Sequence, residues 1–367
     1  MQSNRRNWIK QLGLAAAGMG LGRITALAEP SDLFTETQEA GVPIKLSSNE
    51  NPYGPSPLAR RAMAEKINVS NRYDWDITTR LIETLSVKNN VRKDNILMAA
   101  GSTEVLDLVL KYAANQQGNF VLAYPTYSYW SDTIIRSGLE RKIVPLTKEK
   151  QVDLPAMLKA INAETRFVYI CNPNNPTGTV CERNELLNFV NEASKQTLVI
   201  VDEAYIDFTT ETSLVSEAVQ NKNLVVVRTF SKIYGLAGAR VGYMVAHSRT
   251  MEKVAAMQSW NNGSITVISA AAAMASLNDT KFVSDTYKLN EKARQYTMDQ
   301  LKQLNITCIP SSTNFVYFSL DKYKYDYFRR LKDNHISGTG IYEDEGSWTR
   351  ITIGTLPEMQ KFIAAIR

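Results

Sequence analysis

The stretch at residues 198–232 decides the fold. It contains two apolar runs, LVIV at residues 198–201 and LVVVR at residues 224–228. The first continues directly into Asp202-Glu203-Ala204-Tyr205, and the second into Thr229-Phe230-Ser231-Lys232. Short runs rich in β-branched residues are typical of strands buried in a parallel sheet. Because ligands bind at the carboxyl ends of such strands, the polar residues after each run predict a functional site.

Apolar runs of the same kind occur on both sides of this stretch, and segments with helical periodicity lie between several of them. In one such segment Val105, Leu108, Val109 and Tyr112 fall on one helical face. This alternation predicts an α/β fold, a three-layer structure with a mostly parallel seven-stranded sheet and helices on both faces. The expected strands are residues 95–100, 120–124, 142–146, 167–171, 198–201, 224–228 and 241–246.

The two ends of the chain differ in character from the middle. The segment that follows the first 28 residues is rich in Pro, Asn and Ser, which is typical of an arm. The last hundred or so residues contain a long helical stretch at about 268–304 and strand candidates at 314–319 and 349–353. We therefore expect an N-terminal arm at 29–73, a large domain at 74–262 and a smaller α+β C-terminal domain at 263–367.

Length and composition exclude several classes of protein. The chain has 367 residues, of which 44% are hydrophobic and 22% charged, and these are ordinary values for a globular protein. Beyond the N-terminus no run of about 18 apolar residues occurs, so we expect no membrane span there. The two His and three Cys residues are too scattered for a zinc site. Whether Cys171, Cys181 and Cys308 are free stays open.

The first 28 residues resemble a twin-arginine export signal. Arg5-Arg6 is followed by Trp8-Ile9, by an apolar stretch at residues 12–21, and by the cleavage-site pattern Ala26-Leu27-Ala28. We expect export to the periplasm, whereas the alternative is a basic amphipathic N-terminal helix. Cleavage would remove four positive charges and no negative ones, which lowers the net charge from +5 to +1. A nearly neutral protein gives no electrostatic reason to expect a nucleic acid partner.

The polar residues at successive strand ends have the chemistry that pyridoxal phosphate requires. Lys232 can bind the cofactor's aldehyde, and Asp202 can face its pyridine nitrogen. Asn175 and Tyr205 can donate hydrogen bonds to its phenolic oxygen. The candidates for its phosphate are Ser102 and Thr103, whose N–H groups open a predicted helix, together with Thr229, Ser231 and Arg240.

These motifs resemble those of fold-type I pyridoxal-phosphate aminotransferases of class I/II, and most closely the histidinol-phosphate aminotransferase group. The resemblance runs from about residue 46 to the C-terminus. SSNENPYG at residues 47–54 resembles that group's N-terminal signature, and Asn71-Arg72-Tyr73 resembles its arginine-tyrosine pair. The resemblance implies pyridoxal 5'-phosphate as cofactor. It also implies transfer of an amino group between an amino acid, or a histidinol-phosphate-like amine, and a 2-oxo acid by a ping-pong mechanism.

The resemblance also implies roles for single residues. Tyr127 would stack on the pyridine ring, and Tyr73 would reach the cofactor phosphate of the neighbouring subunit, which implies a homodimer. Arg350 would bind the substrate carboxylate, with Asn51 and Tyr53 as further substrate contacts. The alternatives are ordinary packing for the tyrosines and a sheet-edge salt bridge for Arg350. The catalytic residues would be Lys232, Asp202 and Tyr205.

One stretch departs from the group's pattern. The group has a second arginine before the one that matches Arg350, whereas residues 340–345 read GIYEDE and include Glu343-Asp344-Glu345. Because carboxylates repel a phosphate, we expect a phosphate-free amino acid to be a better substrate than histidinol phosphate. Two alternatives to transamination stay open. They are a decarboxylase or lyase with the same cofactor and fold, and a non-catalytic pyridoxal-binding protein.

Overall fold

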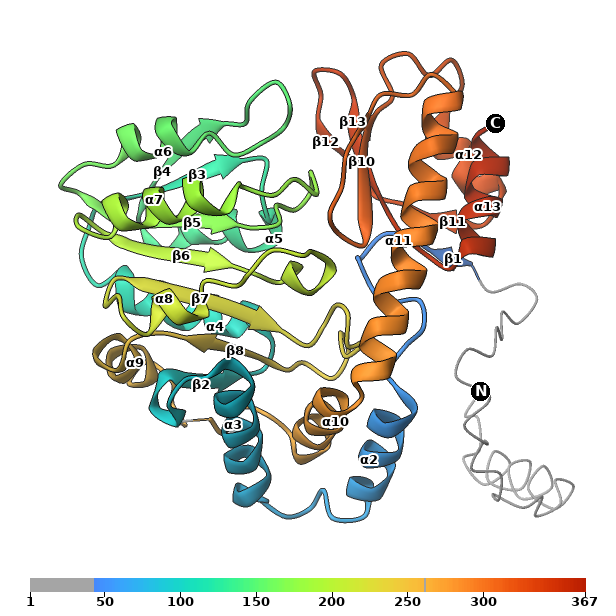
Figure 1. Ribbon diagram of the computed structural model, residues 1–367. Helices are drawn as coiled ribbons and strands as arrows, with labels where there is room; N and C mark the ends of the chain where they lie inside the picture. Colours follow the sequence, from blue (N-terminus) through green and yellow to red (C-terminus); the bar gives the residue numbers. More distant parts are fainter. Residues whose placement is uncertain (1–42, 261) are drawn as a thin grey trace, which may run out of the picture. The chain divides into compact units, whose positions relative to one another are not determined.

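The predicted strands that end near Asp202 and Lys232 belong to a seven-stranded sheet (Figure 1). The structure is a computed structural model that describes residues 43–367 except residue 261. The strand order is β2-β8-β7-β6-β5-β3-β4, and all neighbours are parallel except β8, which is antiparallel to both β2 and β7. The strands are β2 (Ile96–Ala99), β3 (Asn119–Tyr124), β4 (Glu140–Pro145), β5 (Thr165–Cys171), β6 (Leu198–Asp202), β7 (Leu224–Thr229) and β8 (Gly242–Val245).

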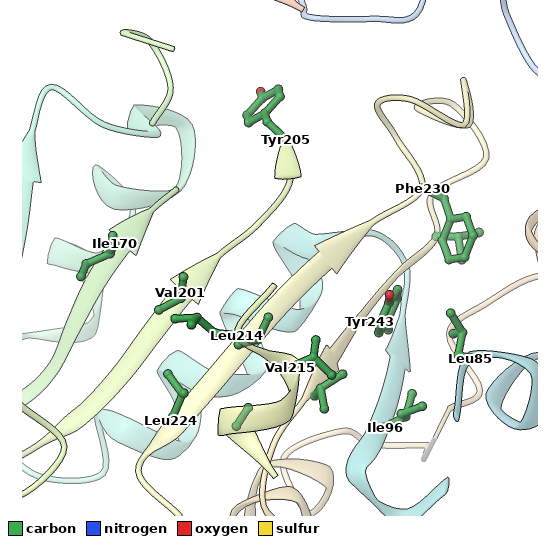
Figure 2. Close-up of a cluster of buried hydrophobic side chains, with 14 of the residues drawn as sticks. Leu85, Ile96, Ile170, Val201, Tyr205, Leu214, Val215, Leu224, Phe230 and Tyr243 are labelled. Carbon is green, nitrogen blue, oxygen red and sulfur yellow. The ribbon is translucent and has the colours of Figure 1, made fainter. Parts of the chain in front are cut away.

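Alternating side chains of the strands pack into two cores, one on each face of the sheet. On β6, Val199 and Val201 face one core, whereas Leu198 and Ile200 face the other. Figure 2 shows part of the first core, where Val201 lies near Leu214. Burial on both faces explains why these strands are continuous apolar runs, and the predicted α/β fold is confirmed.

Helices cover both faces of the sheet. The first core receives buried side chains from α2 (Pro57–Ile67), α3 (Trp75–Asn89), α6 (Leu154–Ala160), α7 (Arg183–Ala193), α8 (Val215–Ala218) and α10 (Val267–Asn278). The second receives them from α4 (Ser102–Ala113), α5 (Ser128–Ser131) and α9 (Ser248–Ala255).

A four-stranded antiparallel sheet of order β12-β13-β10-β9 forms towards the C-terminus. The helical stretch expected at about 268–304 is two helices, because the Asp279 carboxylate caps the second one by accepting from the Phe282 N–H at 3.2 Å. The elements are α11 (Thr280–Gln303), β9 (Cys308–Ile309), β10 (Phe315–Ser319), α12 (Tyr327–Asp333), β12 (Ile341–Glu343), β13 (Trp348–Thr352) and α13 (Leu356–Ile366).

The described part of the predicted arm packs into the fold. Its strand β1 (Ile44–Lys45) pairs in parallel with β11 (Ile336–Ser337), and Figure 1 shows α2 beside α10. Leu46 is 1% exposed and Ala59 is fully buried, so this segment contributes to the core. The domain bounds stay predictions.

The export signal lies outside the described residues. Cys171, Cys181 and Cys308 are free thiols. In the described part of the chain, no helix is long and apolar enough to span a membrane.

Candidate active site

Lys232 follows β7 in a loop that leads the chain away from the sheet. Its Nζ donates to the Ser48 carbonyl oxygen at 3.4 Å and lies 5.4 Å from the centre of the Tyr205 ring. Burial, and then the nearby positive charge of Arg350, lower the pKa of Lys232 to about 8. A substantial fraction of this amine is therefore uncharged at neutral to mildly alkaline pH.

Asp202 ends β6 and is 2% exposed. Its carboxylate accepts from the Tyr169 hydroxyl at 2.9 Å and from the Ala204 N–H at 3.1 Å. Burial raises the pKa of Asp202 to about 6, although both hydrogen bonds and Lys232 favour the charged form. Tyr169 was missed from the sequence, because a tyrosine inside an apolar strand looks like core.

Tyr205 lies between the two sheets. Its hydroxyl accepts from Asn49 Nδ2 at 3.0 Å, and its ring packs edge-on against Phe315 of β10 at 5.0 Å between centres. Asn49 also accepts from the Thr352 hydroxyl at 3.1 Å. Asn49 was not predicted as a site residue, although it belongs to the quoted N-terminal motif.

The predicted phosphate ligands come together at the start of α4. Gly101 precedes that helix with a φ of 89°, and a Cβ built on it would lie 2.2 Å from Arg240 Nη2. A side chain at residue 101 would occupy the space in which the Arg240 guanidinium lies, and the positive φ there favours glycine. Ser231 Oγ accepts from Thr229 at 2.9 Å and from Arg240 Nη1 at 3.4 Å. The N–H groups of Ser102 and Thr103, at the first two positions of α4, complete a cradle for an anion.

Tyr127 borders this cradle. Its hydroxyl lies 3.3 Å from Thr103 Oγ1, and burial raises its pKa. The neutral ring therefore lies beside the start of α4, where it was predicted to contact a cofactor.

Arg350 on β13 is 4% exposed and brings the smaller sheet to the site. Its guanidinium donates to the Asn175 side-chain oxygen and, at 2.9 Å, to the Ser47 carbonyl oxygen. Its central carbon lies 5.3 Å from the Phe315 ring centre and 5.4 Å from that of Tyr342. Its buried Nε has no hydrogen-bond partner among the described residues, so a donor remains available for an anionic ligand.

Tyr73, Asn51 and Tyr53 were also predicted as site residues. Tyr73 is 74% exposed and packs on Trp75 and Trp260, with ring centres 5.3 Å and 5.1 Å away. Asn51 donates to the Ile233 carbonyl oxygen at 2.8 Å and accepts from the Tyr53 N–H at 3.0 Å. The loop of Asn51 and Tyr53 is thus fastened to the residue after Lys232.

The acidic run does not present three unpaired carboxylates to the site. Glu343 forms an ion pair with Lys150 at 2.9 Å and accepts from the Tyr317 hydroxyl at 2.7 Å. Asp344 and Glu345 are exposed in the turn between β12 and β13. The repulsion expected from Glu343 is therefore reduced, because Lys150 neutralises this partly buried member of the run, whereas the preference for a phosphate-free substrate stays a prediction.

Comparison with known proteins identifies the family of this chain. The sequence profile of the family described as aminotransferase class I and II matches residues 42–366. The histidinol-phosphate aminotransferase of Halalkalibacterium halodurans is 33% identical over 327 residues, which cover 88% of each chain.

Solved structures share the fold. The histidinol-phosphate aminotransferase of Sinorhizobium meliloti, solved with pyridoxal-5'-phosphate, has a TM-score of 0.82 at 23% identity and covers 95% of this chain and 97% of its own. The L-threonine-O-3-phosphate decarboxylase of Porphyromonas gingivalis has a TM-score of 0.72 at 24% identity, covering 88% and 98%. The predicted enzyme class is confirmed by the sequence match, and this chain belongs to the aminotransferase class I and II family.

Proposed function

We propose that this aminotransferase uses pyridoxal 5'-phosphate to move an amino group between an amino acid, or a histidinol-phosphate-like amine, and a 2-oxo acid in a ping-pong cycle. The observation that carries the proposal is the buried Asp202 carboxylate beside the partly uncharged Lys232 amine, at the ends of adjacent strands. These are the two groups that this cofactor needs most.

The residues present fit the cofactor. The glycine-lined cradle at Arg240 and the start of α4 suits its dianionic phosphate. The Asp202 carboxylate, held by Tyr169, would keep the pyridine nitrogen protonated, and Tyr127 offers a ring for stacking. The hydroxyl of Tyr205 and the amide of Asn175 would hold its phenolic oxygen.

When bound, the cofactor supplies an electron sink for the carbanion left at the substrate's α-carbon. The chain's own contribution to the reaction is to hold groups and move a proton. Lys232 Nζ would be the group that accepts the α-proton of the bound substrate and later gives it up again. A pKa of about 8 suits this work, because a general base is most effective when its pKa lies near the working pH.

Arg350 would bind the anionic group of the substrate. Its guanidinium is positioned by Asn175 and Ser47, and the ring of Tyr342 lies over it. A carboxylate can bind a guanidinium through two parallel hydrogen bonds, which also fixes the orientation of the α-carbon.

Half-reaction spectroscopy tests the proposal. The purified, cofactor-loaded enzyme is mixed with single amino acids and with histidinol phosphate, without a 2-oxo acid. We expect the visible absorption band to convert to the band of the aminated cofactor and to return when a 2-oxo acid is added. Release of carbon dioxide would identify a decarboxylase instead, and an unchanged spectrum with every amine would contradict catalysis altogether.

We propose further that the enzyme is a homodimer with shared active sites. Tyr73, Trp75 and Trp260 form an exposed aromatic cluster, with exposed fractions of 74%, 55% and 45%. Exposed apolar patches of this kind mark protein interfaces. From such an interface Tyr73 would reach the partner's cofactor phosphate.

Mixed dimers test this arrangement. Tyr73→Phe and Lys232→Ala each damage every site of their own dimers, whereas a hybrid dimer has one undamaged site. Activity should therefore reappear when the two inactive variants are mixed under conditions that allow subunit exchange. A fully active monomer would contradict the proposal.

We also propose that residues 1–28 are an export signal, cleaved after Ala28, that directs the folded enzyme to the periplasm. The support is the order of Arg5-Arg6, the apolar stretch and the cleavage-site pattern. Replacing Arg5-Arg6 by Lys-Lys should keep the protein in the cytoplasm, and unchanged export would contradict the proposal. Separately, we propose a large domain at residues 74–262 and a small domain at residues 263–367.

A further inference from the structure

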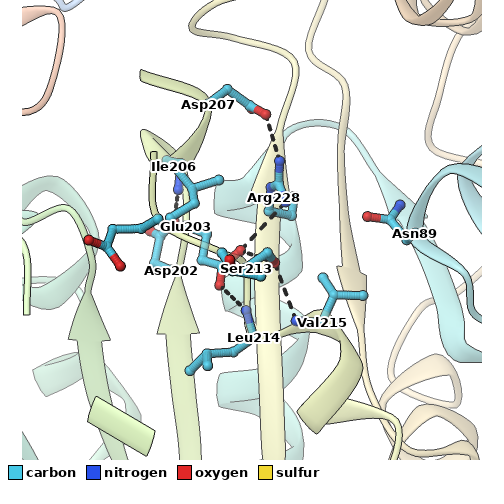
Figure 3. A network of polar contacts seen from close by, with 12 residues as sticks. Asn89, Asp202, Glu203, Ile206, Asp207, Ser213, Leu214, Val215 and Arg228 are labelled. Carbon is cyan, nitrogen blue, oxygen red and sulfur yellow. Dashed lines mark hydrogen bonds and ion pairs between the residues drawn. The ribbon is translucent and has the colours of Figure 1, made fainter. Parts of the chain in front are cut away.

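A buried network of charges lies beside the site, on the other face of the sheet (Figure 3). Arg228 of β7 is 7% exposed and donates to Asp207 at 2.9 Å, while its other terminal nitrogen lies 3.5 Å from Glu203. Glu203 is 2% exposed and accepts from the Ser213 hydroxyl at 2.5 Å and from the Leu214 N–H at 2.8 Å. Both carboxylates are thus held by groups from other segments.

The network is continuous with the site through the backbone. Asp202 and Glu203 are consecutive and point to opposite sides of β6, since Asp202 meets Tyr169 whereas Glu203 meets Arg228. The Glu203 N–H also donates to the Val227 carbonyl oxygen at 2.9 Å. One guanidinium therefore fastens the segment with Asp202 and Tyr205 to the segment that continues into Lys232.

We propose that Arg228 is a positioning residue: by holding Glu203 and Asp207 it fixes residues 202–207 relative to residues 228–232, and thereby fixes Asp202 relative to Lys232. The inference rests on the proposed function. It assigns to Arg228, Glu203 and Asp207 a role in geometry without any contact with substrate or cofactor.

Burial of these charges indicates more than packing. Well-packed apolar side chains often stabilise a core as well as a buried ion pair does. Stability alone is therefore a weak explanation for buried charges. The polar groups that surround the network include Tyr234, Tyr243, Asn89 and Lys88, whose Nζ donates to the Tyr234 hydroxyl at 3.1 Å. Arg228 can serve both carboxylates at once because its guanidinium is a planar fork, which a lysine amine cannot imitate.

Two variants test the role. Arg228→Lys keeps the charge and loses the fork, and Glu203→Gln keeps much of the shape and loses the charge. We expect each to lower kcat by about ten- to a hundred-fold, the range for small misplacements of reacting groups, with little change in KM. We also expect the circular dichroism of the bound cofactor's visible band to weaken, because that signal depends on how the protein orients the chromophore.

Arg183→Lys is the matched control. Arg183 forms a partly buried ion pair with Glu217 at 2.7 Å and donates to the Thr212 carbonyl oxygen, so it also joins separate segments. The second segment reaches the network through Ser213 and Leu214, but it contains neither residues 202–207 nor residues 228–232. It should lower Tm by less than Arg228→Lys does and leave kcat and the cofactor signal unchanged. If Arg228→Lys and Glu203→Gln lower Tm alone, the positioning role is wrong. If the wild type neither binds pyridoxal phosphate nor transaminates, the proposed function fails instead.

Discussion

The cofactor side and the anion side of the site are built in different ways. On the cofactor side, many contacts are local: Asp202 accepts from the N–H two residues on, and Thr229 bonds to Ser231. The exceptions include the bond from Lys232 to Ser48, which spans 184 positions. On the anion side, contacts span the chain: Arg350 bonds to Ser47 across 303 positions and to Asn175 across 175. The first side forms with the seven-stranded sheet, whereas the second needs the N-terminal segment and the smaller sheet to meet it. Damage to one side should therefore be separable from damage to the other.

The largest effect is expected from the cofactor side. Lys232→Ala should lower turnover by at least about 10³-fold, since it removes both the cofactor's attachment point and the general base. Tm should change little, because Nζ makes a single long hydrogen bond of 3.4 Å within the described structure. Steady-state kinetics and thermal unfolding measure both quantities.

Lys253→Ala provides the comparison for that variant. Lys253 is exposed on α9, where its amine lies 5.9 Å from the Tyr112 ring centre, and its loss should leave turnover unchanged. A Lys232→Ala enzyme that transaminates at the wild-type rate would contradict the assignment of the site.

On the anion side, Arg350→Ala should lower kcat/KM for α-amino acids by about ten- to a hundred-fold, the loss expected for a charge-assisted hydrogen bond. The visible band of the bound cofactor should persist, because Lys232 and the phosphate cradle are untouched. For an amine without a carboxylate, kcat/KM should fall only a little.

Arg294→Ala is the matched variant for Arg350. Arg294 is a half-buried arginine that donates at 2.9 Å to the carbonyl oxygen of Thr313, which is not a residue of the proposed site, and its loss should affect neither substrate. Equal losses for the carboxylate-bearing and carboxylate-free substrates would mean that Arg350 supports the structure and does not bind the anion.

The sequence predicted the cofactor side well for a physical reason. Buried parallel strands are continuous apolar runs, so the point where polarity returns marks a strand end, and parallel strand ends share an edge. Asp202 and Lys232 could therefore be placed together from the sequence alone. The seven strands were found within one or two residues of their observed bounds.

The anion side was predicted less completely because its contacts depend on tertiary packing. Strands β1, β9, β11 and β12 are only two or three residues long and leave almost no periodic pattern. The bond from Asn49 to Tyr205 joins residues 156 positions apart, which no local signal reveals. The acidic run at 343–345 could be seen in the sequence, but its neutralisation by Lys150 could not.

The pH profile measures how the two sides influence each other. In the cofactor-free protein, the rate at which Lys232 binds the aldehyde should rise about tenfold per pH unit and level off above about 8, because only the uncharged amine reacts. Since burial and then the Arg350 charge lower the pKa of Lys232, Arg350→Ala should move the profile to higher pH. Stopped-flow absorbance gives the profile. A profile that Arg350→Ala leaves in place would show that the two sides are electrostatically independent.

The smallest effect concerns the acidic run. Because the Glu343 carboxylate already binds Lys150 and the Tyr317 hydroxyl, Glu343→Gln should change the ratio of kcat/KM for histidinol phosphate to that for a phosphate-free aromatic amino acid by less than about fivefold. Exposed Glu345→Gln should leave the ratio unchanged. Lys150→Ala should reduce the ratio, because it leaves the Glu343 charge unpaired. If Glu343→Gln raises the ratio by far more than fivefold, the carboxylate repels the phosphate despite its partner, and the acidic hairpin selects against phosphorylated substrates as the sequence first indicated.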